Sequence, residues 1–188
     1  MIAPAPERDA LVRLIAQRSV RRGRFTLASG RQSDFYVDCR LTTMSPDGLV
    51  LVGPLALAAL RASDWMFDAV GGLTLGADPV SYAIAYASQL AGDPVRCFTV
   101  RKAPKAHGSG KRIEGSFRAG DRVVVIEDTI TTGGSALDAV DAVLAEGGTV
   151  AGIFALVDRE EGGRDAIAAR GFPVVAFTTA RELLTFVP

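Results

Sequence analysis

From residue 46 onward, the chain alternates stretches of helical apolar spacing with short, mostly aliphatic runs. Short apolar runs between helices are typical of strands that are buried on both faces of a parallel sheet. The expected strands are 68–72, 95–100, 122–127, 149–157 and 173–177, and the expected helices are 46–61, 79–90, 134–147 and 163–170. The alternation predicts the α/β fold class, with a parallel sheet flanked by helices.

Residues 1–45 are organised differently. The apolar spacing within residues 7–19 predicts an amphipathic helix, and the aromatic and β-branched stretch "DFYVDCR" (34–40) predicts a strand. No repeat, low-complexity tract or polar linker divides the chain. We therefore expect one domain over residues 1–188, with a small N-terminal elaboration.

Composition bounds the classes of function. The 21 basic residues are balanced by 21 acidic ones, so no overall charge indicates a nucleic-acid or anionic-membrane partner. Cys39 and Cys97 lack metal-ligand spacing, and we expect buried, reduced thiols. The apolar run at 49–60 is too short to span a bilayer, and the charged first twenty residues do not resemble a signal peptide. These features predict a cytoplasmic protein.

Three of the expected strands are followed by loops with unusual composition: "GGLTLGADP" (71–79), "EDTITTGGS" (127–135) and "DREEGG" (158–163). Open parallel sheets bind ligands in the crevice at the carboxyl ends of their strands. We therefore expect the three loops to converge on one site.

The segment "TTGGS" (131–135) has the composition of a phosphate-binding turn. Gly133 and Gly134 allow backbone N–H groups to approach an anion closely, and three hydroxyl residues and the start of a helix add donors. The alternative is an ordinary strand-to-helix turn in which Ser135 caps the helix.

Two adjacent acids, Glu127 and Asp128, precede this turn. Carboxylates that faced a phosphate would repel it, so their partner is either a pair of sugar hydroxyls or a divalent cation. Acids on a diol and amides on a phosphate together predict a ribose 5-phosphate. Neither a GxxxxGK motif nor a GxGxxG motif after a strand occurs, which excludes the common nucleotide-binding loops.

The stretch "VVVIEDTITTGGS" (123–135) resembles the phosphoribosyl pyrophosphate (PRPP) motif of type I phosphoribosyltransferases. The resemblance implies that the two acids hold the ribose 2′- and 3′-hydroxyls and that the loop holds the 5′-phosphate. The implied PRPP-binding residues of this motif are Glu127, Asp128, Thr129, Ile130, Thr131, Thr132, Gly133, Gly134 and Ser135. Mg²⁺ is the implied cofactor, bound mainly through PRPP, with Asp128 as the candidate protein ligand.

Three further segments resemble orotate phosphoribosyltransferases: "FTLASGRQSDFYVDCR" (25–40), "RKAPKAHGSGKRIEG" (101–115) and "LVDREEGG" (156–163). The family transfers the 5-phosphoribosyl group of PRPP to orotate, giving orotidine 5′-phosphate and pyrophosphate in pyrimidine biosynthesis. The resemblance implies an N-terminal hood (1–45), a mobile catalytic loop (101–115) and a homodimer in which this loop reaches the neighbouring site.

The 101–115 segment concentrates positive charge. A charge run is often only a solvated surface, but cations placed over a departing pyrophosphate would stabilise the charge that grows on it. The resemblance implies this role, in catalysis and in PRPP binding, for Arg101, Lys102, Lys105 and His107.

The residues implied to face orotate are Phe35, Tyr36, Thr131 and Arg159. The planar guanidinium fork of Arg159 suits a carboxylate. The alternative is that Arg159 merely pairs with Glu160 or Asp165 on the surface.

The sequence departs from the family pattern at three positions. The segment "GGLTLGADP" (71–79) resembles the pyrophosphate-binding loop of the family, in which Leu75 stands where a lysine is often found. Ala28 stands where many relatives have a lysine in "FTLKSG", and Ala106 replaces an acid in the 101–115 loop. Two cations are therefore absent, and we expect the charge of pyrophosphate to fall to Mg²⁺ and to the 101–115 loop.

Two other functions remain open from the sequence. One is a phosphoribosyltransferase for a purine or another base, and the other is a PRPP-sensing regulator without turnover. A regulator that binds nucleic acid should show a basic face or a helix-turn-helix extension, and the neutral chain indicates neither.

Overall fold

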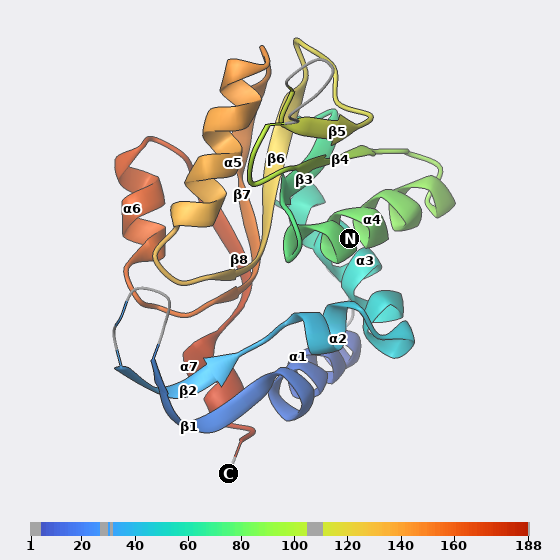
Figure 1. Cartoon of the computed structure of the whole chain (residues 1–188). Coiled ribbons are helices and arrows are strands. Elements are labelled where there is room, and N and C mark those ends of the chain that lie inside the picture. The colour runs from blue at the N-terminus through green and yellow to red at the C-terminus, as the bar shows by residue number, and fades with distance from the viewer. Residues whose placement is uncertain (1–4, 27–29, 31, 105–110, 188) are drawn as a thin grey trace.

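The computed structural model describes residues 5–26, 30, 32–104 and 111–187. They form a six-stranded sheet in the order β5-β4-β3-β6-β7-β8 and a separate β1-β2 hairpin (Figure 1). The parallel strands are β3 (Ala69–Leu73), β4 (Arg96–Val100), β6 (Arg122–Ile130), β7 (Thr149–Asp158) and β8 (Val174–Thr179). The short β5 (Ile113–Gly115) runs antiparallel to β4 at one edge.

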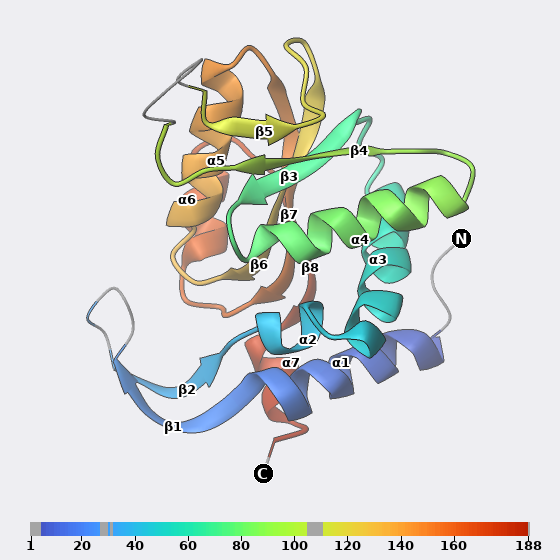
Figure 2. The ribbon, with the colours of Figure 1, turned by 45° about the vertical axis from the view of Figure 1, so that its right-hand side comes forward.

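The sheet is covered by helices on both faces, as Figures 1 and 2 show. Alternate residues of β6 point to opposite faces, so Val124 and Ile126 join one buried cluster while Val123 and Val125 join the other. The first cluster includes α3 (Pro46–Arg61) and α4 (Ala77–Leu90), and the second includes α5 (Gly134–Ala145) and α6 (Gly163–Ala169). Burial on both faces explains why the strands read as continuous aliphatic runs.

The N-terminal elements lie across the carboxyl ends of the parallel strands (Figure 1). They are α1 (Ala5–Ser19), the antiparallel strands β1 (Val20–Thr26) and β2 (Gln32–Val37), and α2 (Arg40–Thr43). We call this group the hood. Leu11 and Ile15 of α1 are buried in the same cluster as α3, so the hood shares the core of the domain.

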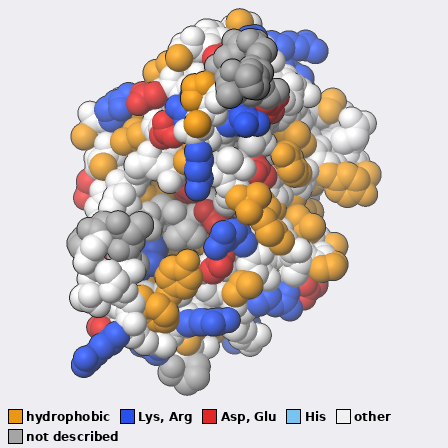
Figure 3. Space-filling model, in the orientation of Figure 1, with side chains coloured by type: hydrophobic (Ala, Val, Ile, Leu, Met, Phe, Trp, Pro, Cys, Tyr) orange, Lys and Arg blue, Asp and Glu red, His pale blue; other side chains and the backbone are white. Residues whose placement is uncertain are grey.

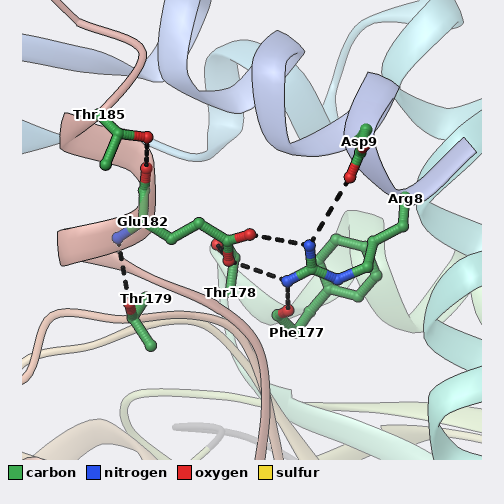
Figure 4. Close-up of polar contacts among 7 residues, drawn as sticks. All are labelled: Arg8, Asp9, Phe177, Thr178, Thr179, Glu182 and Thr185. Carbon is green, nitrogen blue, oxygen red and sulfur yellow. Dashed lines mark hydrogen bonds and ion pairs between the residues drawn. The ribbon is translucent and has the colours of Figure 1, made fainter. Parts of the chain in front are cut away.

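A polar contact ties the hood to the C-terminal helix α7 (Ala180–Leu184), as Figure 4 shows. Arg8 donates from Nη1 and Nη2 to the two carboxylate oxygens of Glu182, at 2.8 Å each. Arg8 also lies over the ring of Phe177, and Thr178 donates its hydroxyl to Glu182. The hood is thereby held against the end of β8.

The predicted α/β class, the parallel sheet and its flanking helices are confirmed, and α3 has the predicted bounds. Strands β1 and β5 and helices α2 and α7 were not predicted from the sequence. The predicted end of β6 at residue 127 is too early, because the strand continues to Ile130 by pairing with Asp158 of β7. Within the 101–115 segment, expected to be a loop throughout, residues 113–115 form β5, and 105–110 lie outside the described residues.

Among the described residues, no helix is both long enough and apolar enough to cross a membrane. The single-domain division, with residues 1–45 as the hood, stays a prediction.

We expect Glu182→Gln to destabilise the fold by about 1 kcal/mol at pH 7, because the contact with Arg8 is bidentate but partly exposed. At this chain length the melting temperature should fall by about 2–4 °C. The hydrogen bond from Arg8 lowers the pKa of Glu182 in the folded protein. The stabilisation is therefore fully present above the pKa that Glu182 has in the unfolded chain, and it is lost as pH falls through the lower pKa of the folded protein.

Thermal melts of both proteins at pH 7 and at about pH 3 provide the measurement. The difference in melting temperature should shrink at the lower pH, and a constant difference would contradict this account. Asp93→Asn, at an exposed pair with Arg61, serves as a control in which little change is expected at either pH.

Candidate active site

A cleft of about 590 Å³ lies between the carboxyl ends of the strands and the hood. Figure 3 shows a hollow in this region with acidic and basic side chains beside one another. Its lining residues are Thr26, Tyr36, Val37, Asp38, Arg40, Leu73, Thr74, Leu75, Gly76, Lys102, Glu127, Asp128, Thr129, Thr131, Thr132, Ser135 and Arg159. All three loops after β3, β6 and β7 contribute, so their predicted convergence is confirmed.

The turn after β6 presents donors to the cleft. Gly133 is the N-cap residue of α5, with φ of 83°, and no side chain caps the helix. The alternative that Ser135 caps this helix is therefore wrong, and its hydroxyl lines the cleft together with those of Thr131 and Thr132. The first N–H groups of a helix have no intrahelical partner, and its N-terminus favours anions. The turn can therefore bind a phosphate group.

Packing from α6 holds this turn in place. A side chain at Gly133 would approach the carbonyl oxygen of Gly163 to 2.9 Å, and its positive φ also disfavours other residues. The beginning of α6 thus packs against the turn and disfavours any side chain at Gly133.

The two acids lie next to the turn, within the last part of β6. Glu127 is 7% exposed, and its burial, followed by the charge of Asp128, raises its pKa well above the ordinary value. Burial also raises the pKa of Asp128, although its hydrogen bonds and the charge of Arg40 act in the opposite direction. Two carboxylates in this setting are stabilised as anions by hydroxyl donors or a cation. The geometry therefore fits a sugar diol or a divalent ion.

Asp128 is positioned by its neighbours. Its Oδ1 accepts a hydrogen bond of 2.9 Å from the backbone N–H of Thr129. Its carboxylate also lies so close to Gly76 that a methyl group there would overlap it. The acid thus connects the end of β6 with the loop after β3.

The loop after β3 is held by Asp78, a residue that the sequence analysis did not select. This buried carboxylate accepts hydrogen bonds from the hydroxyls of Thr74 (2.7 Å) and Thr99 (2.8 Å). The side chain of Leu75 is left exposed at the cleft. An acid in the first turn of a helix after a glycine-rich loop was the available signal.

Arg159 lies in the cleft wall and is only 4% exposed. Its Nη2 is 2.7 Å from Glu161 and 3.1 Å from the hydroxyl of Ser33. Its guanidinium stacks 4.5 Å from the ring centre of Phe35. The alternative of a surface pair with Glu160 or Asp165 is wrong, because Arg159 is buried and Glu160 pairs with Arg181.

The structure brings most of the expected residues together. Those that line the cleft are Tyr36, Lys102, Glu127, Asp128, Thr129, Thr131, Thr132, Ser135 and Arg159. Ile130 instead packs in the core, Phe35 lies under Arg159, and Arg101 is paired with Glu114. Gly133 and Gly134 shape the turn without lining the cleft. Lys105 and His107 lie outside the described residues, as do Ala28 and Ala106.

The hood adds two residues that were missed, Asp38 and Arg40. Arg40 donates from Nε and Nη2 to the two carboxylate oxygens of Asp38, at 2.8 and 2.9 Å. Their signal was an acid and a base two residues apart, directly after a strand. Cys39 between them is buried and accepts a hydrogen bond from Thr129, whereas Cys97 is half-buried, so the expectation of buried thiols holds for Cys39 alone.

A parallel sheet with a hood, paired acids at a strand end and a helix N-terminus beside them define the class of type I phosphoribosyltransferases. No protein-family model matches the chain. Orotate phosphoribosyltransferase of Aquifex aeolicus is 46% identical over 95% of this chain and 98% of its own length. The Mycobacterium tuberculosis H37Ra protein of the same name is 50% identical over 88% and 90% of the respective lengths.

Solved structures agree with these relatives. The M. tuberculosis H37Rv orotate phosphoribosyltransferase in complex with Fe(III) dicitrate has a TM-score of 0.82 and 46% identity, covering 95% of this chain and 99% of that one. Its complex with PRPP has a TM-score of 0.77 and 38% identity, with 96% and 93% covered. The chain belongs to the orotate phosphoribosyltransferase family.

Gly76→Ala should impair PRPP binding while leaving the fold intact. The backbone of Gly76 has ordinary helical angles, so alanine is allowed, but its methyl group would displace Asp128. The displaced Asp128 would lose its hydrogen bond to the ligand, and loss of a hydrogen bond to a charged group would raise KM for PRPP by about tenfold. Steady-state kinetics and a thermal melt provide the measurement, and an unchanged KM at an unchanged melting temperature would contradict the proposed position of Asp128.

Proposed function

We propose that the chain transfers the 5-phosphoribosyl group of PRPP to orotate, giving orotidine 5′-phosphate and pyrophosphate. The observation that carries this proposal is the arrangement of one cleft: paired carboxylates and an open helix N-terminus on one wall, and a buried arginine directly after the neighbouring strand β7. The first two suit a ribose 5-phosphate, and the third suits an anionic base. The reaction belongs to pyrimidine biosynthesis and is expected in the cytoplasm.

The ribose and its phosphate bind along the end of β6. Glu127 and Asp128 accept hydrogen bonds from the 2′- and 3′-hydroxyls, which are donors matched to acceptor-only carboxylates. Residues Thr131 to Ser135 hold the 5′-phosphate through the helix N-terminus and three hydroxyls. Binding at both ends fixes the position of C1, where the bond to pyrophosphate breaks.

Orotate binds beside Arg159, Tyr36 and Thr131. The Glu161 carboxylate and the Phe35 ring fix the guanidinium plane, so that the fork is oriented before orotate binds. A carboxylate on the base then pairs with a buried cation, which a neutral purine cannot do. Orotate N1 attacks ribose C1 as pyrophosphate leaves, through a state with positive charge on the sugar.

Charge on the departing pyrophosphate is stabilised by cations from the 101–115 segment. Lys102 lines the cleft, and Arg101, Lys105 and His107 belong to the same segment. Mg²⁺ would be held mainly by PRPP, with Asp128 as the candidate protein ligand, and it would supply further charge neutralisation when bound. The residues fit this arrangement because the carboxylate of Asp128 lines the cleft and supplies the oxygen donor that Mg²⁺ prefers.

The chain acts as a homodimer, with the 101–115 segment reaching the neighbouring site. Exposed apolar side chains on the hood side and on α4 support this proposal: Leu41, Met44, Tyr82, Tyr86 and Leu90. Figure 3 shows apolar side chains gathered on the side where α4 lies in Figure 1. Large apolar patches of this kind commonly mark protein interfaces.

The direct test is release of pyrophosphate on mixing the protein with PRPP, Mg²⁺ and orotate. Release that needs orotate, and does not occur with adenine, guanine or hypoxanthine, is the expected result. Release with a purine would favour the other transferase, and PRPP binding without release would favour the regulator.

Arg159→Ala should raise KM for orotate by about tenfold or more while KM for PRPP changes little, because the lost contact is a charged hydrogen bond to the base. Arg181→Ala is a matched control. Arg181 pairs with Glu160, the neighbour of Arg159 after β7, but its side chain is exposed. Initial rates with each substrate varied provide the measurement. A rise in KM for PRPP with orotate unaffected would count against the assignment.

A further inference from the structure

Arg40 is a cation in the cleft that the proposed mechanism leaves without a role. It is the first residue of α2 and lines the cleft from the hood side. Its side chain is 43% exposed, so it meets both the protein and the open space of the cleft. A surface arginine beside an acid is usually only a solvated ion pair, and its position decides whether it does more.

The pair with Asp38 fixes the orientation of Arg40. Nε and Nη2 donate to the two oxygens of Asp38, and the backbone N–H of Arg40 donates to the same carboxylate at 3.2 Å. Nη1 has no hydrogen-bond partner in the described part of the chain. Asp38 therefore offsets part of the charge but holds the guanidinium as a fixed fork, with donors left for a ligand.

Arg40 lines the same cleft as residues 73–76 at the end of β3 and in the loop that follows it. Its charge acts on Asp128, and the carboxylate of Asp128 packs against Gly76 of that loop. Arg159, the other cleft arginine, is already paired with Glu161 and stacked on Phe35. The two arginines are thus oriented by different neighbours.

The loop after β3 brings no positive charge of its own. Its cleft-lining residues are Leu73, Thr74, Leu75 and Gly76, and Leu75 is 52% exposed. Of the cleft-lining residues that the structure describes, only Lys102, Arg159 and Arg40 are cationic. Since the proposed function assigns Arg159 to orotate, Arg40 and Lys102 are the described cleft-lining cations that remain for a highly charged anion at this loop.

We propose that Arg40 binds the pyrophosphate group of PRPP from the hood. This inference rests on the proposed function. The loop after β3 has no cation to neutralise the pyrophosphate, and Arg40 of the hood supplies part of that positive charge. Arg40 donates hydrogen bonds to phosphate oxygens both in PRPP and in the departing pyrophosphate.

The test compares Arg40→Gln and Arg40→Lys with the parent protein. Calorimetry measures binding of inorganic pyrophosphate with Mg²⁺ and of ribose 5-phosphate, and kinetics measure KM for PRPP and for orotate. Arg170→Gln is the matched control, because Arg170 pairs with Asp141, is 45% exposed and does not line the cleft. Thermal melts establish that each variant is folded.

Arg40→Gln should weaken pyrophosphate binding and raise KM for PRPP by about tenfold, the size expected for a hydrogen bond to a charged group. Ribose 5-phosphate binding should stay within about twofold, and Arg40→Lys should lie between Gln and the parent, because it keeps the charge but loses the fork. Arg170→Gln should match the parent.

Unchanged pyrophosphate binding in Arg40→Gln would overturn the inference. An equal loss of ribose 5-phosphate binding would overturn it too, since Arg40 would then support the site as a whole. If Arg40→Gln does not fold, Arg40→Lys decides by the same comparison. A parent protein that binds pyrophosphate through Arg40 but releases none with orotate would refute the proposed function and leave this inference standing.

Discussion

The site depends on the way β6 ends. Its aliphatic residues are buried on both faces, so the strand must lie in the middle of the sheet, and its end must open into the crevice beyond. Glu127 and Asp128 still belong to this strand, whereas the following residues turn into α5. The geometry of the strand thereby places two carboxylates beside a helix N-terminus. The carboxylates repel an anion that the N-terminus attracts, so the two together would bind one anion poorly.

This combination separates the functions of the two groups. Burial raises the pKa of both acids, and the helix N-terminus next to them is a site for an anion. A ligand that carries hydroxyls at one end and a phosphate at the other satisfies both. The hood completes the enclosure, because Tyr36, Asp38 and Arg40 close the side that the sheet leaves open.

Much of this was predictable because the relevant signals are local. Aliphatic runs gave the parallel strands, and the Thr/Gly-rich turn after two acids gave the ribose 5-phosphate site. Arg159 was selected from the family resemblance, but its hydrogen bond to Ser33 and its stacking on Phe35 depend on the fold of the hood. Asp78 was missed because its partner Thr99 is distant in the sequence and meets it only in the folded protein. Arg40 was missed because only the fold brings it to the cleft. Strand β5 was missed because its few residues pair with β4 only in the folded sheet.

The central claim is that the end of β6 recognises a sugar diol next to a phosphate. Its most direct test is calorimetric comparison of ribose 5-phosphate and 2-deoxyribose 5-phosphate, which share the phosphate and differ in the 2-hydroxyl. The ribose compound should bind about tenfold more tightly, because its 2-hydroxyl donates a hydrogen bond to a buried carboxylate. Equal affinity for the two sugars would contradict it.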